Sequence, residues 1–203
     1  PADSDVDFAL DLSVTSTDGG DTATVTASFN VTVNAVADAP TLNTADVTVD
    51  EDMVVPLTVD PALTDIDGSE TLSLTISGVP TGSSLSAGTD QGGGVWVLTP
   101  AQTAGLTLSP VASNADDFTL AVTATSTEAE NGDTASTTGT INVVIHDVAD
   151  PPSLSVSDAT GNEDAAIPLT IASALTDTDG SETLSLTVGG VPTGASLSAG
   201  TDQ

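Results

Sequence analysis

The chain has 203 residues, with no lysine or arginine and 30 aspartate or glutamate residues, which gives a formal net charge of -30 at pH 7. This charge excludes nucleic acid and direct contact with an anionic membrane surface as partners, because the chain has no basic side chain to neutralise a phosphate. Thiol chemistry, a membrane-spanning helix and a signal peptide are not expected either, since the chain has no cysteine, no apolar run of about 18 residues and no basic segment ahead of an apolar one.

Apolar residues alternate with polar ones along several segments, which in chain order are residues 8–14, 29–33, 72–76, 118–122 and 141–145. A period of two that is rich in Val, Ile and Thr is typical of strands with one buried and one solvated face. Turn motifs such as Asp67-Gly68 and Asn131-Gly132 punctuate the sequence at short intervals. We therefore predict an all-β fold of the sandwich type rather than the disorder that an acidic, aromatic-poor composition suggests.

The strongest internal feature is a repeat of 112 residues, in which residues 35–91 align with residues 147–203 without a gap. Between residues 62–91 and 174–203, 26 of 30 positions are identical. The start of the chain repeats the middle, with Phe8 at an offset of 110 from Phe118. The repeat predicts the C-terminal half of a preceding domain at 1–37, one complete domain at 38–149 and the N-terminal half of a following domain at 150–203.

Half of a sandwich exposes apolar strand faces and open edges, which is costly. The two halves at the ends of the chain are complementary apart from one hairpin. We therefore expect neighbouring repeats of the same chain to be partners, and we hypothesise that half domains of different molecules pair head to tail.

The acidic residues gather in turns and at the junctions between repeats. A turn such as Asp65-x-Asp67-Gly68 brings several hard oxygens near one point, which suits Ca²⁺ with its roughly six to eight oxygen ligands. Zinc and copper fit poorly because soft and nitrogen ligands are lacking. Acidic turns can also be no more than solvated caps, but no cation in the chain offsets their repulsion, and we favour calcium. The predicted calcium ligands are Asp38, Glu51, Asp52, Asp65, Asp67, Glu70, Asp116, Asp147, Asp150, Glu163, Asp164, Asp177, Asp179 and Glu182.

The order of these motifs resembles known families. Asp147-x-x-Asp150-x-Pro152 at a junction, an acidic pair ending one strand and Asp-x-Asp ending the next resemble the calcium-linked arrangement of cadherin repeats. Ala-Leu-Thr-Asp-x-Asp-Gly-Ser-Glu-Thr-Leu-Ser-Leu at 62–74, followed by Gly-Val-Pro-Thr-Gly-x-Ser-Leu-Ser at 78–86, is similar to extender repeats of giant bacterial RTX adhesins. That group includes LapA-like biofilm adhesins and ice-binding adhesins of marine bacteria.

The resemblance implies tandem Ig-like or cadherin-like Greek-key sandwiches, joined end to end and stiffened by calcium. It implies a non-catalytic extender on the bacterial cell surface that projects a distal adhesion domain. The second junction would take its ligands from Glu51, Asp52, Asp147, Asp150, Asp177 and Asp179. The first would use Asp38, Asp65 and Asp67. Because Ala37 and Ala149 replace the cadherin linker Asn, and Ala35 stands where the second linker has Asp147, the two junctions need not hold the same ions.

Other functions have weaker support in the sequence. His146 is the single histidine and stands in a chain without Cys, Lys, Arg or Tyr, so a catalytic set is not expected. A glycan- or ice-binding module is the main alternative, since Trp96 could stack on a sugar and the Thr-x-Thr runs could form an ice-binding face. Trp96 is at least as well explained as a core residue, and the threonines as the solvated face of ordinary strands.

Overall fold

The computed structural model describes residues 4–112, 114–177 and 179–201, and in them the regular structure is β-strand apart from one three-residue 3-10 helix. The all-β prediction is therefore confirmed. The chain divides into two compact units, Pro1–His146 and Asp147–Gln203. No helix in the described part of the chain is long and apolar enough to cross a membrane.

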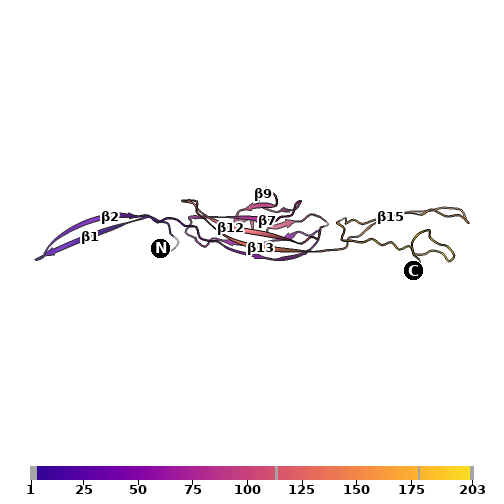
Figure 1. Cartoon of the computed structure of the whole chain (residues 1–203), viewed down its shortest axis with the longest axis horizontal. Helices are drawn as coiled ribbons and strands as arrows, with labels where there is room; N and C mark the ends of the chain where they lie inside the picture. The colour runs from indigo at the N-terminus through magenta and orange to yellow at the C-terminus, as the bar shows by residue number, and fades with distance from the viewer. Residues whose placement is uncertain (1–3, 113, 178, 202–203) are drawn as a thin grey trace. The chain divides into compact units, whose positions relative to one another are not determined.

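The first unit carries most of the strands, and β7, β12 and β13 lie side by side in one sheet (Figure 1). This sheet has the order β4-β13-β12-β7-β10-β9, and a second sheet has the order β5-β11-β8. Two further pairs are β1-β2 and β3-β6. All of these pairings are antiparallel except β4 with β13, which is parallel. The elements of this unit are β1 (Phe8–Asp18), β2 (Asp21–Val31), β3 (Thr41–Ala45), β4 (Val47–Asp50), β5 (Val55–Pro56), β6 (Thr58–Ala62), β7 (Glu70–Ser77), β8 (Ser84–Leu85), β9 (Thr89–Gly92), β10 (Val95–Leu98), η1 (Pro100–Gln102), β11 (Thr107–Ser109), β12 (Phe118–Glu128) and β13 (Thr134–His146).

One hydrophobic core lies between the sheets of residues 38–146. Alternate residues of β12, among them Leu120 and Val122, are fully buried, and the intervening threonines point to the opposite face. The six-stranded sheet also contributes Leu74, Ile76, Leu98, Ile141, Val143 and Ile145 to this core. Opposite them lie Val55, Leu57, Val59, Leu85, Leu106 and Leu108. The predicted alternation is confirmed in these strands, and the layers are consistent with a β-sandwich.

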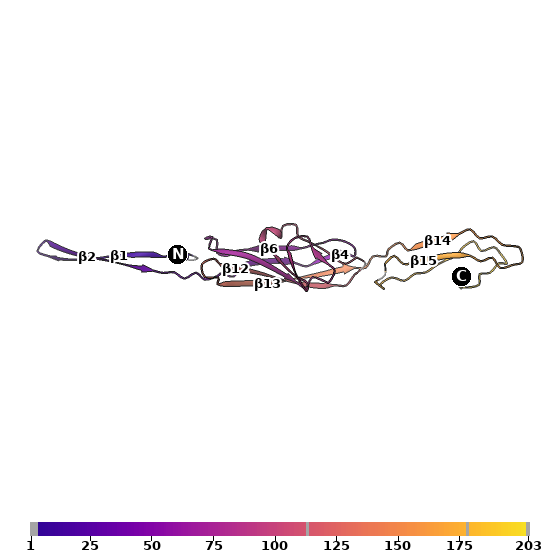
Figure 2. The same cartoon turned by 90° about the horizontal axis from the view of Figure 1, so that it is seen from above.

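The β1-β2 ribbon and the second unit lack such a core. The strands predicted at 8–14 and 29–33 are present, but their apolar side chains are exposed because no other described strand pairs with the ribbon. In the second unit, β14 (Ser153–Ser157) pairs with β15 (Thr170–Ala174), as the view from above shows (Figure 2). These regions are predicted from the repeat to be halves of other domains.

Both copies of the repeat adopt the same turns, although their surroundings differ. Asp52 has φ 60° and Asp164, its counterpart 112 residues later, has φ 61°. Gly68 and Gly180 have φ 99° and 100°. A positive φ is uncommon for a residue other than glycine. Its recurrence at equivalent aspartates shows that the local sequence specifies these turns without the rest of the sandwich.

Candidate metal centre

The ends of two paired strands direct glutamates into the interior of the first unit. Along β12 the core-facing positions run from Leu120 and Val122 to Ser126 and Glu128, and Glu128 is only 3% exposed. On the neighbouring β7, Glu70 lies on the core-facing side and is 7% exposed. The period of two that builds the core therefore also buries these two carboxylates at its end.

Glu70 and Glu128 lie directly opposite each other in the antiparallel β7-β12 ladder. The Oε2 atom of each is buried and has no hydrogen-bond partner among the described residues. Like charges at opposed positions destabilise a sheet, and a buried carboxylate without a partner is costly. Because the chain contains no lysine or arginine, no basic side chain neutralises the pair.

The linker that precedes the sandwich is fastened to this end of it. The Asp38 backbone N–H donates to Glu70 Oε1 at 2.6 Å, and Ser126 Oγ donates to the Asp38 carbonyl at 2.6 Å. Asn131, in the β12-β13 turn, donates from Nδ2 to the Ala35 carbonyl at 2.7 Å. The linker backbone at Asp38 thus lies beside Glu70 and the buried end of β12.

The acidic turn before β7 reaches the same place. The Asp67 N–H donates to Asp65 Oδ1 at 2.8 Å, and the Ser69 N–H donates to Asp67 Oδ1 at 2.8 Å. Asp65 is buried, whereas Asp67 is exposed, and the Ser69 N–H lowers the pKa of Asp67 below its ordinary value. The turn therefore presents Asp65 to the interior and Asp67 to solvent.

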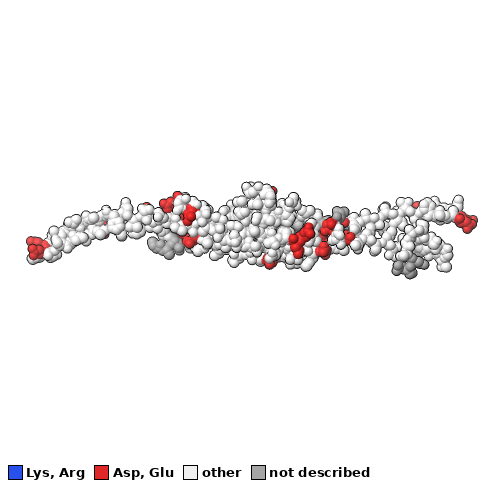
Figure 3. All heavy atoms as spheres, in the orientation of Figure 1, with Lys and Arg blue, Asp and Glu red and all other residues white. Residues whose placement is uncertain are grey.

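A cleft of about 270 Å³ lies in the first unit, and its lining includes four acidic residues: Asp5, Asp38, Asp65 and Glu128. Together with Glu70 they form what we call the junction cluster. Burial raises the pKa of Glu128, and the negative charges of Glu70, Asp5 and Asp65 raise it further against a lowering by Ser69. Carboxylates are visible along the face of the molecule in Figure 3, with no basic residue among them.

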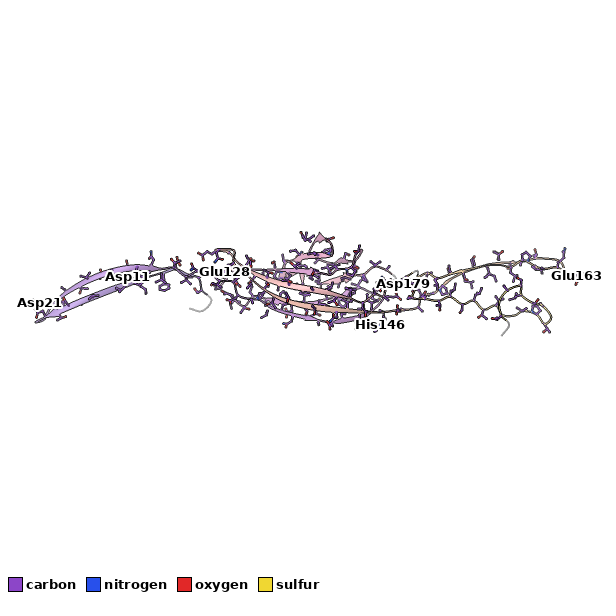
Figure 4. The ribbon with its side chains drawn as sticks, viewed as in Figure 1. Asp11, Asp21, Glu128, His146, Glu163 and Asp179 are labelled. Atoms are coloured by element: carbon purple, nitrogen blue, oxygen red, sulfur yellow. The ribbon has the colours of Figure 1, made fainter. Side chains whose placement is uncertain are left out.

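The chemistry of the junction cluster fits a hard cation. It offers carboxylate oxygens only, two of them buried and unpartnered, and such oxygens are the ligands that Ca²⁺ takes in flexible arrangements. A protein interior tolerates several such charges only when they are protonated or balanced by a cation. Glu128 lies at the end of the sandwich away from His146 (Figure 4), so no imidazole is available at the cluster.

The structure brings together three of the predicted calcium ligands, two of them assigned to the first junction, and leaves others apart. Asp38, Asp65 and Glu70 belong to the junction cluster, whereas Asp67 does not line the cleft. Asp116 precedes the opposite end of β12 and is exposed there, where its N–H donates to Asn114 Oδ1 at 3.1 Å.

The predicted ligands of the second junction are placed within each unit as follows. In the first unit, the Glu51 N–H donates to the His146 carbonyl at 2.9 Å, and Asp52 follows in the same turn. In the second unit, the Asp150 N–H donates to Glu182 Oε1, as the Asp38 N–H does to Glu70. The Asp179 N–H donates to Asp177 Oδ1 at 2.9 Å, which repeats the Asp65 turn. The remaining predicted ligands of this unit, Asp147, Glu163 and Asp164, are exposed.

Two members of the junction cluster, Glu128 and Asp5, were not predicted from the sequence. The signal for Glu128 was present, because continuing the inward positions of residues 118–122 in steps of two leads to 128. For Asp5 no pattern in the sequence distinguishes it from other acidic residues. Trp96 is half-buried and packs against the core, as expected for the core interpretation.

No protein-family model matches the chain, and no curated protein matches it. The junction cluster and the 112-residue repeat are therefore the observations from which a function can be inferred.

Proposed function

We propose that the chain is a non-catalytic structural module whose repeats are linked and stiffened by Ca²⁺ at their junctions. The observation that supports this proposal is the opposed pair Glu70 and Glu128, buried with unpartnered Oε2 atoms beside the linker. In a chain without basic residues, a divalent cation is the simplest group that satisfies both carboxylates at neutral pH.

Ca²⁺ at the junction cluster would bind residues from separate parts of the chain. Glu70, Glu128 and Asp65 belong to the sandwich, Asp38 belongs to the linker, and Asp5 belongs to the segment before β1. An ion held by all three parts converts mutual repulsion, about 4 kcal/mol per close pair at an effective dielectric of about 20, into attraction. It thereby removes the hinge freedom that linked domains otherwise have.

The same residue types recur 112 positions later, which extends the proposal to the second junction. Asp150, Asp177 and Glu182 repeat Asp38, Asp65 and Glu70, with the same backbone hydrogen bonds in the second unit. Their resemblance to RTX-adhesin extenders and cadherin repeats supports an array of Ig-like or cadherin-like sandwiches. We place this array outside the cell, on a bacterial surface, as the spacer that projects an adhesion domain.

Calcium concentration would then control stiffness. Extracellular calcium modules bind with Kd of about 10⁻⁴–10⁻³ M, so the sites would fill outside a cell and remain empty in a cytoplasm. At free calcium about 100 times Kd, each site present only in the folded state adds about 2.7 kcal/mol of stability. An array that is loose before export and stiff afterwards follows from these affinities.

Calorimetric unfolding of the whole chain, in a calcium titration and in chelator, tests the proposal. We expect Tm to rise with calcium, and we expect Glu128→Gln to remove most of this rise because it deletes a buried ligand. Glu130→Gln is the matched control, since Glu130 is exposed two residues further along the chain. A Tm that does not change between calcium and chelator would overturn the calcium proposal.

A further inference from the structure

The β1-β2 ribbon carries an apolar face that is buried in its own repeat. Leu12 is 47% exposed and Val14 is 69% exposed. Their counterparts at the offset of 110 are Val122 and Ala124, which are completely buried in the core. The ribbon has the pairing of the sandwich hairpin, with Leu10 opposite Phe29 as Leu120 is opposite Ile141. The ribbon is therefore a copy of the β12-β13 hairpin, but no described strand pairs with it in the way that β7 pairs with β12.

The second unit carries the complementary face. Leu184, Leu186 and Val188 are 40–51% exposed. Their counterparts at the offset of 112 are Leu72, Leu74 and Ile76 of β7, of which the last two are buried in the core. Residues 182–189 form no strand in the described structure, although their sequence is nearly that of β7.

The complete sandwich shows how these two faces fit together. In it, β7 and β12 pair antiparallel, with Leu74 opposite Ala124 and Ile76 opposite Val122. Applied to the counterparts, the same ladder places Leu186 opposite Val14 and Val188 opposite Leu12. Both faces are alternating and apolar, so the register is fixed by burial: a shift of one residue would turn every apolar side chain outward.

We propose that the β1-β2 ribbon of one molecule pairs with residues 182–189 of a second copy of this chain, in the register of β12 with β7. The occupant is a second copy because the chain itself contains both halves of the ladder and an intact example of their pairing. The contact is heterologous, so it joins molecules head to tail and yields rings where the rotation closes and filaments where it does not. The inference stands on strand pairing and is independent of the calcium proposal.

Disulfide capture tests the register, because the chain has no cysteine of its own. Ser13 and Thr187 correspond to Thr123 and Thr75, which are directly opposite each other and alternate with the buried positions of their strands. Ser13→Cys in one preparation and Thr187→Cys in another should give a mixed disulfide when combined. Ser13→Cys with Ser185→Cys is the control, since a diagonal pair lies about 7–8 Å apart and exceeds disulfide reach.

Light scattering over a concentration series tests the association itself. We expect the mass to rise with concentration, and Leu12→Asp to weaken association by at least about tenfold, which corresponds to about 1.4 kcal/mol. Ser13→Asp adds the same charge on the other face of the strand and should have a much smaller effect. A mass that stays monomeric without mixed disulfide, or Ser13→Cys linking to itself as readily as to Thr187→Cys, would overturn the proposal.

Discussion

Residues 35–91 and residues 147–203 are two copies of one repeat, closely similar from residue 62 onward, but they have different structures. In both copies the first pair of strands forms, with β3 on β6 and β14 on β15 in the same register. β7 has no counterpart strand among the described residues of the second copy. The difference separates what the local sequence specifies from what needs a distant partner.

Among the described residues of the second copy, no hairpin like β12-β13 pairs with residues 182–189. Leu74 is 1% exposed beside β12, whereas Leu186, in the same local sequence, is 51% exposed. Turns with a fixed φ, such as that at Gly68 and Gly180, form in both copies because they depend on a few adjacent residues. A strand with one apolar face gains its stability only when that face is covered.

The largest test of this comparison is Leu74→Ala against Leu186→Ala. Removing the buried Leu74 side chain should cost about 2–5 kcal/mol in the free energy of unfolding, through lost burial and the cavity left behind. Leu186→Ala should stay within about 0.5 kcal/mol. Chemical denaturation monitored by the fluorescence of Trp96, which packs against the core, measures both. Both variants are measured at concentrations at which light scattering shows monomers. Equal losses in the free energy of unfolding would contradict the idea that only the first copy buries this leucine.

A second test uses glycines with the same backbone and different surroundings. Gly78 and Gly190 both have positive φ, 86° and 78°. A Cβ on Gly78 would lie 2.6 Å from the Thr119 carbonyl oxygen, whereas on Gly190 it would meet nothing within 4 Å. Gly78→Ala should cost at least about 1–2 kcal/mol from the left-handed backbone, with the carbonyl contact added.

Gly190→Ala should cost less, because it carries the strain of the left-handed backbone without the added contact with a carbonyl oxygen. Thermal unfolding of the two variants beside the parent chain gives the difference. If Gly190→Ala lowered Tm as much as Gly78→Ala, Gly190 would have to be as closely surrounded by other atoms as Gly78 is.

The fold was largely predictable because its signals are local and repeated. The alternation around Leu120 and Ile141 predicted strands, and the 112-residue offset predicted which regions are equivalent. The sequence did not indicate which strands are neighbours in the sheet. Only the β7-β12 ladder shows that Glu70 and Glu128 are opposed. The two glutamates are 58 residues apart in a sequence with acidic residues at many turns, and no local pattern links them.

The candidate site was predictable in part for the same reason. Asp38, Asp65 and Glu70 belong to motifs that repeat near a junction, so spacing alone indicated them. Asp67 was predicted with Asp65, but the turn sends the two side chains to different environments. Asp5 lies close enough to raise the pKa of Glu128, and this depends on the tertiary structure of the first unit.

A smaller effect is expected from the hydroxyl that fastens the linker. Ser126 is fully buried, and its Oγ donates to the Asp38 carbonyl, whereas its counterpart Ser16 is exposed. Ser126→Ala should cost about 1–2 kcal/mol, because it leaves a carbonyl without its donor. Ser16→Ala should stay within about 0.5 kcal/mol. Denaturant unfolding of each variant checks this, and a Ser126→Ala cost no larger than that of Ser16→Ala would mean that the linker is held by other contacts.

The smallest expected effect is a change in the pH dependence of stability without calcium. Because the pKa of Glu128 is raised in the folded chain, the folded state binds its proton before the unfolded state does. The stability that the protonated Glu128 contributes is fully present below the ordinary pKa of glutamate, and it is lost as pH rises through the raised pKa of the folded state. In chelator, Glu128→Gln should therefore unfold at a higher denaturant concentration than the parent at neutral pH, and the gap should close as pH falls toward about 4.5.

Calcium should reverse the sign of this effect, since the ion needs the charged carboxylate and the amide of Glu128→Gln gives a weaker ligand. Glu130→Gln provides the baseline, because the Glu130 side chain is exposed to water in the folded chain as well as in the unfolded chain. A Glu128→Gln curve parallel to the Glu130→Gln curve from pH 4.5 to 7.5 would show that folding leaves the pKa of Glu128 unchanged, against the expectation from its burial. The Glu128 carboxylate would then be ionised in the folded chain without an electrostatic cost, and the distinction between this end of the sandwich and its exposed counterpart at Asp18 would be one of packing alone.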